Sequence, residues 1–233
     1  MEFHPQKCQL LRITNKRKQI LYDYTIHGET LQYTEDAKYL GVILDAQMKW
    51  KKHITSTASK ANKTLFFLNR HLSHCPTHVK KQCYEVYVRP ILEYSSTVWD
   101  PYHRNEIDIL EKVQRRAARF TSKNFNPNVD SGTLVADLGW QTLAQRRKNN
   151  KLIMFHKALI GETNIPTQHL QNNNNRTRNS NYTFRLPASK IDAHLYSFFP
   201  STIRHWNKLN IITKQQASSD NFRRSLLIHT SGD

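Results

Sequence analysis

A chain of 233 residues is long enough for one or two small domains, each with its own hydrophobic core. Lys and Arg number 35 against 18 Asp and Glu, a formal charge of +17, so a polyanionic partner is expected, with nucleic acid first and an anionic membrane surface second. No window approaches 18 apolar residues and the sequence begins with neither a basic nor an apolar stretch, so we expect no membrane span and no signal peptide. Three irregularly spaced cysteines make no disulfide framework, which predicts an intracellular protein of the nucleus or cytoplasm that is not secreted.

The first part of the chain reads as short strands. Residues 7–14 and 19–26 are strand-like runs joined by a basic turn, and residues 31–33 form a third run. Residues 39–44 alternate apolar side chains and predict a strand that is buried on both faces. Gly41 would lie in the middle of that strand, a position that marks close approach of another backbone or of a ligand. Such short strands cannot cover both faces of the last one, so they resemble the edge of a larger sheet.

From residue 54 the hydrophobic period becomes helical. A stripe at steps of three and four residues predicts a helix to about residue 72. A second helix starts near Pro76 and should kink or stop at Pro90, and a third helix spans about residues 106–120. The stripe of the first helix consists of Ile54, Ala58, Ala61, Leu65, Leu68 and Leu72. The second helix is expected to bury Val79, Cys83, Val86 and Tyr87, and the third Ile107, Leu110, Val113, Ala117 and Phe120. Together the helices predict a small bundle.

The remainder of the chain divides by composition. Thr142 can cap a basic helix that runs to about residue 160. Residues 165–194 contain four consecutive Asn and few apolar side chains, which is typical of a flexible linker. Residues 195–233 are rich in aromatic side chains and are expected to pack back on the body of the protein.

Several separated blocks resemble a known family. They are residues 38–54 (KYLGVILDAQMKWKKHI), 60–72 (KANKTLFFLNRHL), 87–102 (YVRPILEYSSTVWDPY) and 110–120 (LEKVQRRAARF). In sequence and order they are similar to the region after the catalytic palm in reverse transcriptases of non-LTR retrotransposons of the Jockey and chicken-repeat type. The resemblance extends from the first residue to about residue 222.

This resemblance implies an α+β fold. A small antiparallel sheet or hairpin, the edge of a polymerase palm, would precede a mainly α-helical thumb bundle and a partly disordered C-terminal extension. The implied segments are palm-end strands with a primer-grip hairpin (1–53), a helical thumb (54–123), a basic helical extension (124–164), an Asn-rich flexible linker (165–194) and an aromatic C-terminal segment (195–233). The Tyr-Leu-Gly turn resembles the family's primer grip, which holds the primer 3′ end, so Tyr39, Leu40 and Gly41 are the candidate grip residues.

Polymerase chemistry needs clustered carboxylates that hold two Mg²⁺ ions. The near match is Glu35-Asp36, but in the family the catalytic hairpin precedes the segment that residues 1–14 resemble, whereas this pair follows it. We interpret it as an acidic pair in a loop. The catalytic carboxylates are then missing, so the chain alone is predicted to be inactive and to bind no cofactor, while Mg²⁺ belongs to the intact family enzyme. Lys7 resembles a lysine that could neutralise the leaving pyrophosphate; a solvated lysine explains it equally well.

A cluster of imidazoles and thiols lies between residues 71 and 83. Its members are His71, His74, Cys75, His78 and Cys83. These are zinc-ligand types, but a loop and a helix should scatter them and no Cys-x-x-Cys pair is present, so no metal site is predicted.

Rows of basic residues are the stronger signal. They could line one groove and neutralise the phosphates of a heteroduplex without reading its sequence, although a solvated basic face is the alternative. The candidate nucleic-acid-binding residues are Lys49, Trp50, Lys51, Lys52, Lys60, Lys63, Arg115, Arg116 and Arg119. We expect all four tryptophans to be core anchors and not base-stacking platforms.

Three functions fit the sequence. The favoured one is a fragment of an RNA-directed DNA polymerase that grips the primer end and clamps the template–primer duplex. The alternatives are a stand-alone nucleic-acid-binding module, a domesticated thumb, and a decayed reading frame without function. The expected partners are an RNA template, an RNA/DNA duplex and the palm, fingers and endonuclease portions of the same polyprotein. We expect neither a membrane nor a small-molecule substrate for the chain alone.

Overall fold

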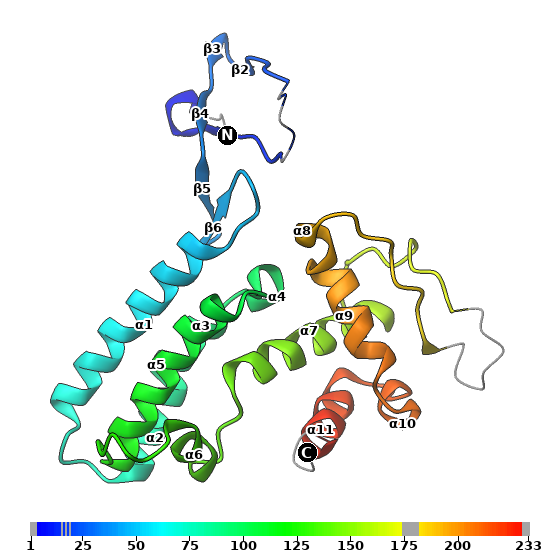
Figure 1. Ribbon diagram of the computed structural model, residues 1–233. Coiled ribbons are helices and arrows are strands. Elements are labelled where there is room, and N and C mark those ends of the chain that lie inside the picture. The colour runs from blue at the N-terminus through cyan, green and yellow to red at the C-terminus, as the bar shows by residue number, and fades with distance from the viewer. Residues whose placement is uncertain (1–3, 15, 17, 19, 174–181, 230–233) are drawn as a thin grey trace.

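The computed structural model describes residues 4–14, 16, 18, 20–173 and 182–229. Figure 1 shows a strand region at one end of the long helix α1, a first group of helices around α1 and α5, and a second group formed by the C-terminal helices, with α7 running between the two groups. Helices dominate and short strands precede them, so the α+β prediction is confirmed. No described helix is both long enough and apolar enough to cross a bilayer.

The strands of the described region pair two by two. The 3-10 turn η1 (Pro5–Lys7) precedes β1 (Gln9–Leu11), which pairs in parallel with β4 (Gln32–Thr34). The antiparallel pairs are β2 (Thr25–Ile26) with β3 (Glu29–Thr30) and β5 (Asp36–Tyr39) with β6 (Val42–Asp45). None of the described residues before Val42 is buried. The strand region therefore has no core of its own, as expected for two-stranded pairs.

The strand predicted over residues 39–44 is in fact a hairpin. Leu40 and Gly41 form the two-residue turn between β5 and β6, with φ angles of 46° and 84°. A pair of positive φ angles is typical of the type I′ turn that matches strand twist. Tyr39 and Leu40 are exposed and only Val42 is buried, so the predictions of a doubly buried strand and of a mid-strand glycine were wrong. Apolar alternation continues across the turn, which is why the pattern concealed the chain reversal.

The first group of helices follows the predicted bundle. It contains α1 (Lys51–His71), α2 (Thr77–Cys83), the π-helical η2 (Tyr84–Val88), α3 (Arg89–Glu93), α4 (Ser96–Trp99), α5 (Arg104–Ser122) and α6 (Ser131–Asp137). Helix α1 packs against α5, η2 and α3, and α5 packs against α6. The predicted stripe of α1 is confirmed, since all its members are buried except Leu72, which is partly buried. In α5 only Ile107 of the predicted set is half-buried rather than buried.

The buried face of the second helix is shifted along the chain by one residue from the predicted face. Lys80, Tyr84, Val88 and Leu92 are buried, whereas Val86 and Tyr87 are exposed. Lys80 was not among the residues predicted to be buried. The Lys80 ammonium donates to the carbonyl oxygens of Ser73 (3.0 Å) and Phe120 (3.5 Å). The expected disturbance before Pro90 is present as the π-helical segment η2.

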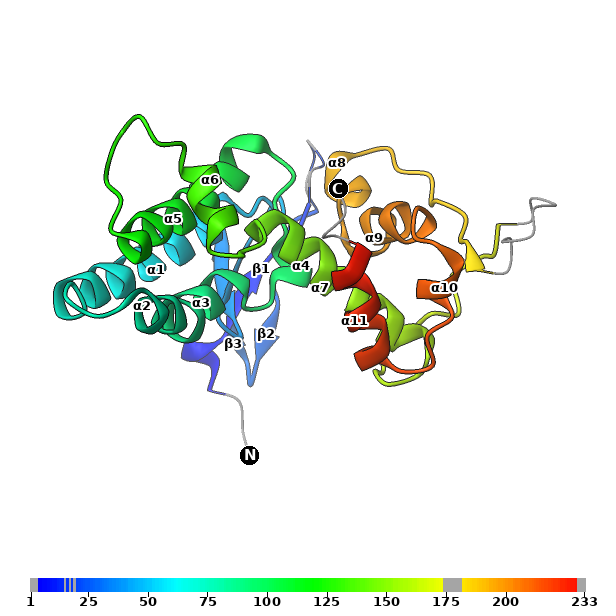
Figure 2. The ribbon, with the colours of Figure 1, turned by 90° about the horizontal axis from the view of Figure 1, so that it is seen from below.

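The second group of helices surrounds the later turns of α7 (Leu143–Leu159). Thr142 caps this helix as predicted, because its hydroxyl accepts from the amide of Gln145 at 3.1 Å. The other members are α8 (Asp192–Leu195), α9 (Phe198–Asn207), α10 (Ile211–Lys214) and α11 (Ser219–His229). Figure 2 shows this group from a second direction, again beside α7. Its core is made by Leu152, Ile153, Phe155, Ile203, Trp206, Phe222 and Leu226.

The aromatic C-terminal segment thus packs back on the body, as expected. Residues 174–181 of the predicted linker lie outside the described residues, and at its flanks Asn172 and Phe184 form an isolated antiparallel bridge. Trp99, Trp140 and Trp206 are buried core anchors, while Trp50 is partly buried against the first core. The segment boundaries expected from the sequence stay predictions.

Candidate nucleic-acid interface

Two side chains from the helices hold the Leu40–Gly41 turn in place. The Tyr94 hydroxyl donates to the carbonyl oxygen of Leu40 at 3.0 Å. A Cβ atom on Gly41 would lie 3.3 Å from Cε1 of Tyr94, so this ring covers the glycine closely. On α1, Nδ1 of His53 accepts from the amide of Ile43 at 3.3 Å. The turn is therefore fixed to the body by hydrogen bonds from two different helical segments.

His53 is neutral in this arrangement. The residue is 5% exposed, and its ring packs edge-on against Trp99 with 4.9 Å between ring centroids. Burial lowers the pKa of His53. Because Nδ1 accepts a hydrogen bond, Nε2 carries the proton, and this tautomer suits the contact of 3.4 Å with the Thr57 hydroxyl. A charged imidazolium would lose the acceptor that binds β6.

Sequence reasoning had selected neither His53 nor Tyr94. The bond from Tyr94 to Leu40 joins residues 54 positions apart, and no periodicity of a single helix reports such a contact. The signal that was available is the family resemblance, since His53 lies in the block at residues 38–54 and Tyr94 in the block at residues 87–102.

The turn borders a cavity of about 410 Å³. Its wall includes Leu40 and Gly41 from the turn, Lys60 from α1 and Tyr94 after α3. Lys38 of β5 adds a second cation. Two of the candidate grip residues, Leu40 and Gly41, therefore meet Lys60 of the basic row at one site, whereas Tyr39 does not line the cavity.

The solvent face of α1 carries a row of cations. Lys52, Lys60 and Lys63 are exposed and lie on the face opposite the buried stripe, and Arg70 continues the row. At 1.5 Å per residue the first and third lysine are about 16 Å apart along the helix axis. Lys52 also forms an ion pair with Asp36, and the hydrogen bond and charge of that carboxylate raise the pKa of Lys52.

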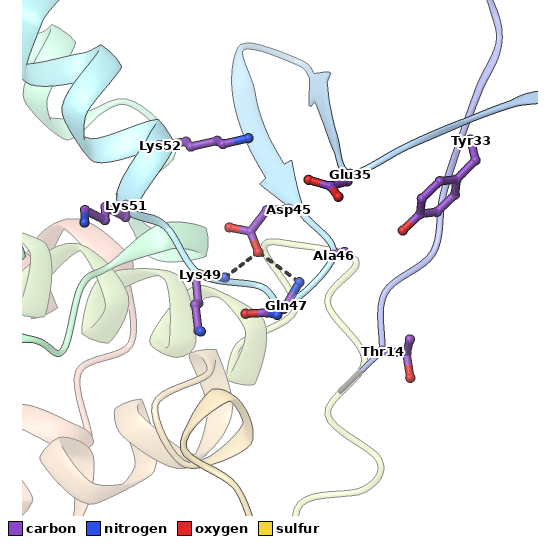
Figure 3. Close-up of a pocket in the computed structure, with 9 residues that line it drawn as sticks. All are labelled: Thr14, Tyr33, Glu35, Asp45, Ala46, Gln47, Lys49, Lys51 and Lys52. Carbon is purple, nitrogen blue, oxygen red and sulfur yellow. Dashed lines mark hydrogen bonds between the residues drawn. The ribbon is translucent and has the colours of Figure 1, made fainter. Parts of the chain in front are cut away.

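A second cavity, of about 400 Å³, lies at the start of α1 (Figure 3). It brings Lys49, Lys51 and Lys52 together with Glu35 and Asp45. Asp45 Oδ1 accepts from the backbone amides of Gln47 and Lys49, both at 2.9 Å. In Figure 3 the Lys52 side chain extends toward the β5–β6 hairpin, whereas Lys51 points away from it. The lysines of this segment thus point in different directions around the loop between β6 and α1, which the Asp45 carboxylate stabilises by its two hydrogen bonds.

The predicted arginines of α5 occupy different surroundings. Arg116 is exposed and donates to Oδ1 of Asn62 on α1 at 3.1 Å, beside the lysine row. Arg115 forms an ion pair with Asp108 at 3.8 Å. Arg119 donates at 2.8 Å to two carbonyl oxygens of the following loop, those of Asn126 and Val129. The structure therefore places Arg116 beside the α1 row and engages Arg119 in holding a loop.

The described residues do not form a two-metal site. Asp36 is paired with Lys52, and no group of three or more His, Cys, Asp or Glu side chains in the described part of the chain is placed to hold a metal ion. The His/Cys cluster between residues 71 and 83 is included in that finding; Nδ1 of His71 lies 2.8 Å from the carbonyl oxygen of Phe67. Lys7 is exposed at the end of η1. The donor set does not fit the Mg²⁺ pair of a polymerase.

Part of the chain is similar in sequence to curated proteins. An uncharacterised protein of Caenorhabditis elegans is 26% identical over 132 residues, which are 54% of this chain and 65% of that protein. An RNA-directed DNA polymerase from the mobile element jockey of Drosophila funebris is 28% identical over 116 residues, which are 48% of this chain and 13% of the polymerase. The chain therefore spans less than two thirds of either relative. No family model and no solved structure matches it.

About half of the chain is thus weakly similar to an RNA-directed DNA polymerase from a mobile element. The grip and clamp roles expected for particular residues stay predictions.

Proposed function

We propose that this chain is the primer-grip and thumb portion of a retrotransposon reverse transcriptase, which holds a template–primer duplex. One observation carries the proposal. Leu40 is 72% exposed and adopts a φ of 46° at the tip of the turn, beside the cationic face of α1. A leucine in this conformation costs about 1–2 kcal/mol, and exposing it gains nothing in the isolated chain. The type I′ turn accounts for the φ angle of Leu40, and the turn presents this apolar side chain beside the cations, where the end of a bound duplex would meet it.

The geometry suits a duplex end at the turn. Lys60 and Lys63 would neutralise phosphates of the backbone, while Leu40 and Gly41 would meet the terminal sugar and base at the end of the same face. Phosphate contacts of this kind position a duplex without reading its sequence. Tyr94 and His53 would act by holding the turn and not by touching the nucleic acid.

Binding should therefore depend strongly on salt. The probe is a labelled RNA/DNA duplex titrated by fluorescence anisotropy between roughly 50 and 200 mM salt. Lys63→Ala should lower the slope of log affinity against log salt by about 1, because one phosphate contact is lost. Lys157→Ala is the matched control, since this lysine lies on α7 and pairs with Glu162 at 3.8 Å. Equal slopes for the two variants, or no binding at low salt, would contradict the proposal.

The chain alone should not extend a primer, because no described carboxylate cluster can hold two metal ions. Primer extension with Mg²⁺ or Mn²⁺ is expected to give no product above background. Extension that disappears in Asp36→Asn would overturn this expectation. Duplex binding without extension is also the result expected of a stand-alone binding module. If the chain does not bind the duplex at all, a decayed reading frame is favoured.

A further inference from the structure

A large apolar cavity lies where the two helical groups and the strand region meet. Its volume is about 670 Å³, within the range of small-ligand sites. Four segments that are distant in sequence line it: Ile13, Thr14 and Lys16 after β1, Met48 and Trp50 before α1, residues 98–102 around the end of α4, and residues 191–198 at α8 and the start of α9. Figures 1 and 2 both show α4 and α8 on the side of the molecule that adjoins the strand region. The duplex face described above does not include this cavity.

Aromatic rings dominate the wall of the cavity. Trp50, Tyr102, Tyr196 and Phe198 line it. The rings of Tyr102 and Tyr196 are stacked in parallel, with 4.1 Å between centroids and 3° between planes. The Tyr102 hydroxyl is a hydrogen-bond donor at neutral pH, as any tyrosine hydroxyl is, and burial, followed by the nearby charge of Asp192, raises its pKa further. The wall therefore offers flat apolar faces with polar groups at their edges.

In the part of the chain that the structure describes, one carboxylate and one lysine line the cavity. Asp100 is the only carboxylate among the described lining residues, and both its oxygens are occupied, by Nε of Arg147 at 2.8 Å and by the Lys151 ammonium at 3.0 Å. Both of these cations are themselves buried. Lys16 is exposed and adds a cation at the strand side. A ligand that combines a planar ring with a phosphate fits this combination.

We propose that this aromatic cavity receives an unpaired base of single-stranded nucleic acid, with Lys16 beside the adjacent phosphate. A base within a duplex has both faces stacked and its edge paired, so only an unpaired base can enter. Stacking on aromatic side chains accepts any base, because every base has a flat π-face. The inference rests on the proposed nucleic-acid-binding function and adds a single-strand site to its duplex face.

The test compares two overhangs of equal charge. Both probes are an RNA/DNA duplex with a single-stranded extension, and in one of them the extension carries abasic sugars, so that phosphates are kept and bases are lost. The protein should bind the intact probe about tenfold more tightly than the abasic probe. Tyr196→Ala and Ala193→Trp should each abolish this difference, the first by removing a stacking ring and the second by filling the cavity.

Two controls make the outcome decisive. Tyr87→Ala removes a tyrosine that is 59% exposed and does not line the cavity, so the tenfold difference should persist. Ala193→Trp leaves the Tyr102–Tyr196 stack in place, which keeps the test valid if Tyr196→Ala fails to fold. Equal affinity of the wild type for the two probes, or loss of the difference in Tyr87→Ala, would overturn the cavity proposal. A blunt duplex separates the two proposals, because its binding depends on the α1 face alone.

Discussion

Two hairpins of this protein share one turn geometry and differ in everything around it. His27 and Gly28 join β2 to β3 with φ angles of 52° and 82°, and Leu40 and Gly41 join β5 to β6 with 46° and 84°. Nothing lies within 4 Å of a Cβ atom built on Gly28, whereas Gly41 is covered by the Tyr94 ring. Local sequence thus suffices to reverse the chain, and the second hairpin is in addition hydrogen-bonded to Tyr94 and His53 of the helical region. We infer that the free hairpin contributes little to global stability and the held one contributes more.

The largest expected effect comes from comparing a buried leucine of the helices with an exposed leucine of the strand region. Leu92 in α3 is fully buried, and Leu21 in the strand region is 77% exposed. Leu92→Ala should lower the free energy of unfolding by about 2–5 kcal/mol, because it removes buried apolar surface and leaves a cavity. Leu21→Ala should change it by less than about 0.5 kcal/mol. Urea denaturation measures both. A cost for Leu21→Ala close to that of Leu92→Ala would show that the strand region has a core of its own.

Lowering the pH should destabilise the β5–β6 hairpin, with a smaller effect on the free energy of unfolding than that of Leu92→Ala. Burial lowers the pKa of His53 in the folded state below its unfolded value of about 6.5. Between those two values the unfolded chain binds more protons, so the free energy of unfolding falls as the pH falls through this window. The protection of the Ile43 amide, which is the intrinsic exchange rate at the same pH divided by the observed rate, should then fall.

Other histidines add to that acid effect and can be separated from it. Burial, with the charges of Lys148, Lys151 and Lys208, lowers the pKa of His205 to about 4, and burial also lowers the pKa of His156. His53→Gln should remove the pH dependence of the protection of Ile43 while leaving that of the second helical group. His27→Gln, in the free turn, is the control and should change neither.

Substitution of the two turn glycines compares the hairpins directly. An L-residue with a positive φ costs about 1–2 kcal/mol. Gly41→Ala should lower global stability by that amount, because the hairpin is coupled to the helices and the new Cβ also meets Tyr94. Gly28→Ala carries the same backbone strain but should leave the unfolding midpoint unchanged. Equal shifts for the two variants would mean that the hairpins are coupled to the body alike.

The smallest effect concerns one hydrogen bond. Tyr94→Phe keeps the ring over Gly41 and removes the donor to the Leu40 carbonyl oxygen. We expect a loss of about 0.5 kcal/mol, at the low end for a hydrogen bond because the site is exposed to water. Hydrogen exchange within β5 and β6 should rise, while that of β2 and β3 stays the same. Unchanged exchange in both hairpins would assign the holding of the turn to His53 alone.

The parts of the fold that follow from local periodicity were predictable. The stripe of α1 and the cap at Thr142 each depend on neighbours three or four residues away, so the sequence reports them directly. The Leu40–Gly41 turn and the buried Lys80 were not predicted. The turn breaks no hydrophobic pattern, and Lys80 is stabilised by the carbonyl oxygen of Phe120, forty residues away.

The candidate site divides in the same way. The lysines of α1 share a face by helical spacing alone, and that spacing was visible in the sequence. Arg119 was predicted to contact nucleic acid, but its guanidinium holds the loop at residues 126–129, which depends on how that loop folds back. The aromatic cavity joins four distant segments, so no local pattern could reveal it.

Helix α7 belongs to both cores, and this has a consequence during translation. The first core is complete at Leu143, whereas the second needs Leu226, about 80 residues later. At about 5–20 residues per second, the ribosome takes about 4–16 seconds to make that stretch. The first group of helices can therefore close while α7 still shows Leu152 and Phe155 to solvent. Until α11 emerges, a nascent chain of this protein exposes the apolar face of the second half of α7, which other apolar surfaces can bind.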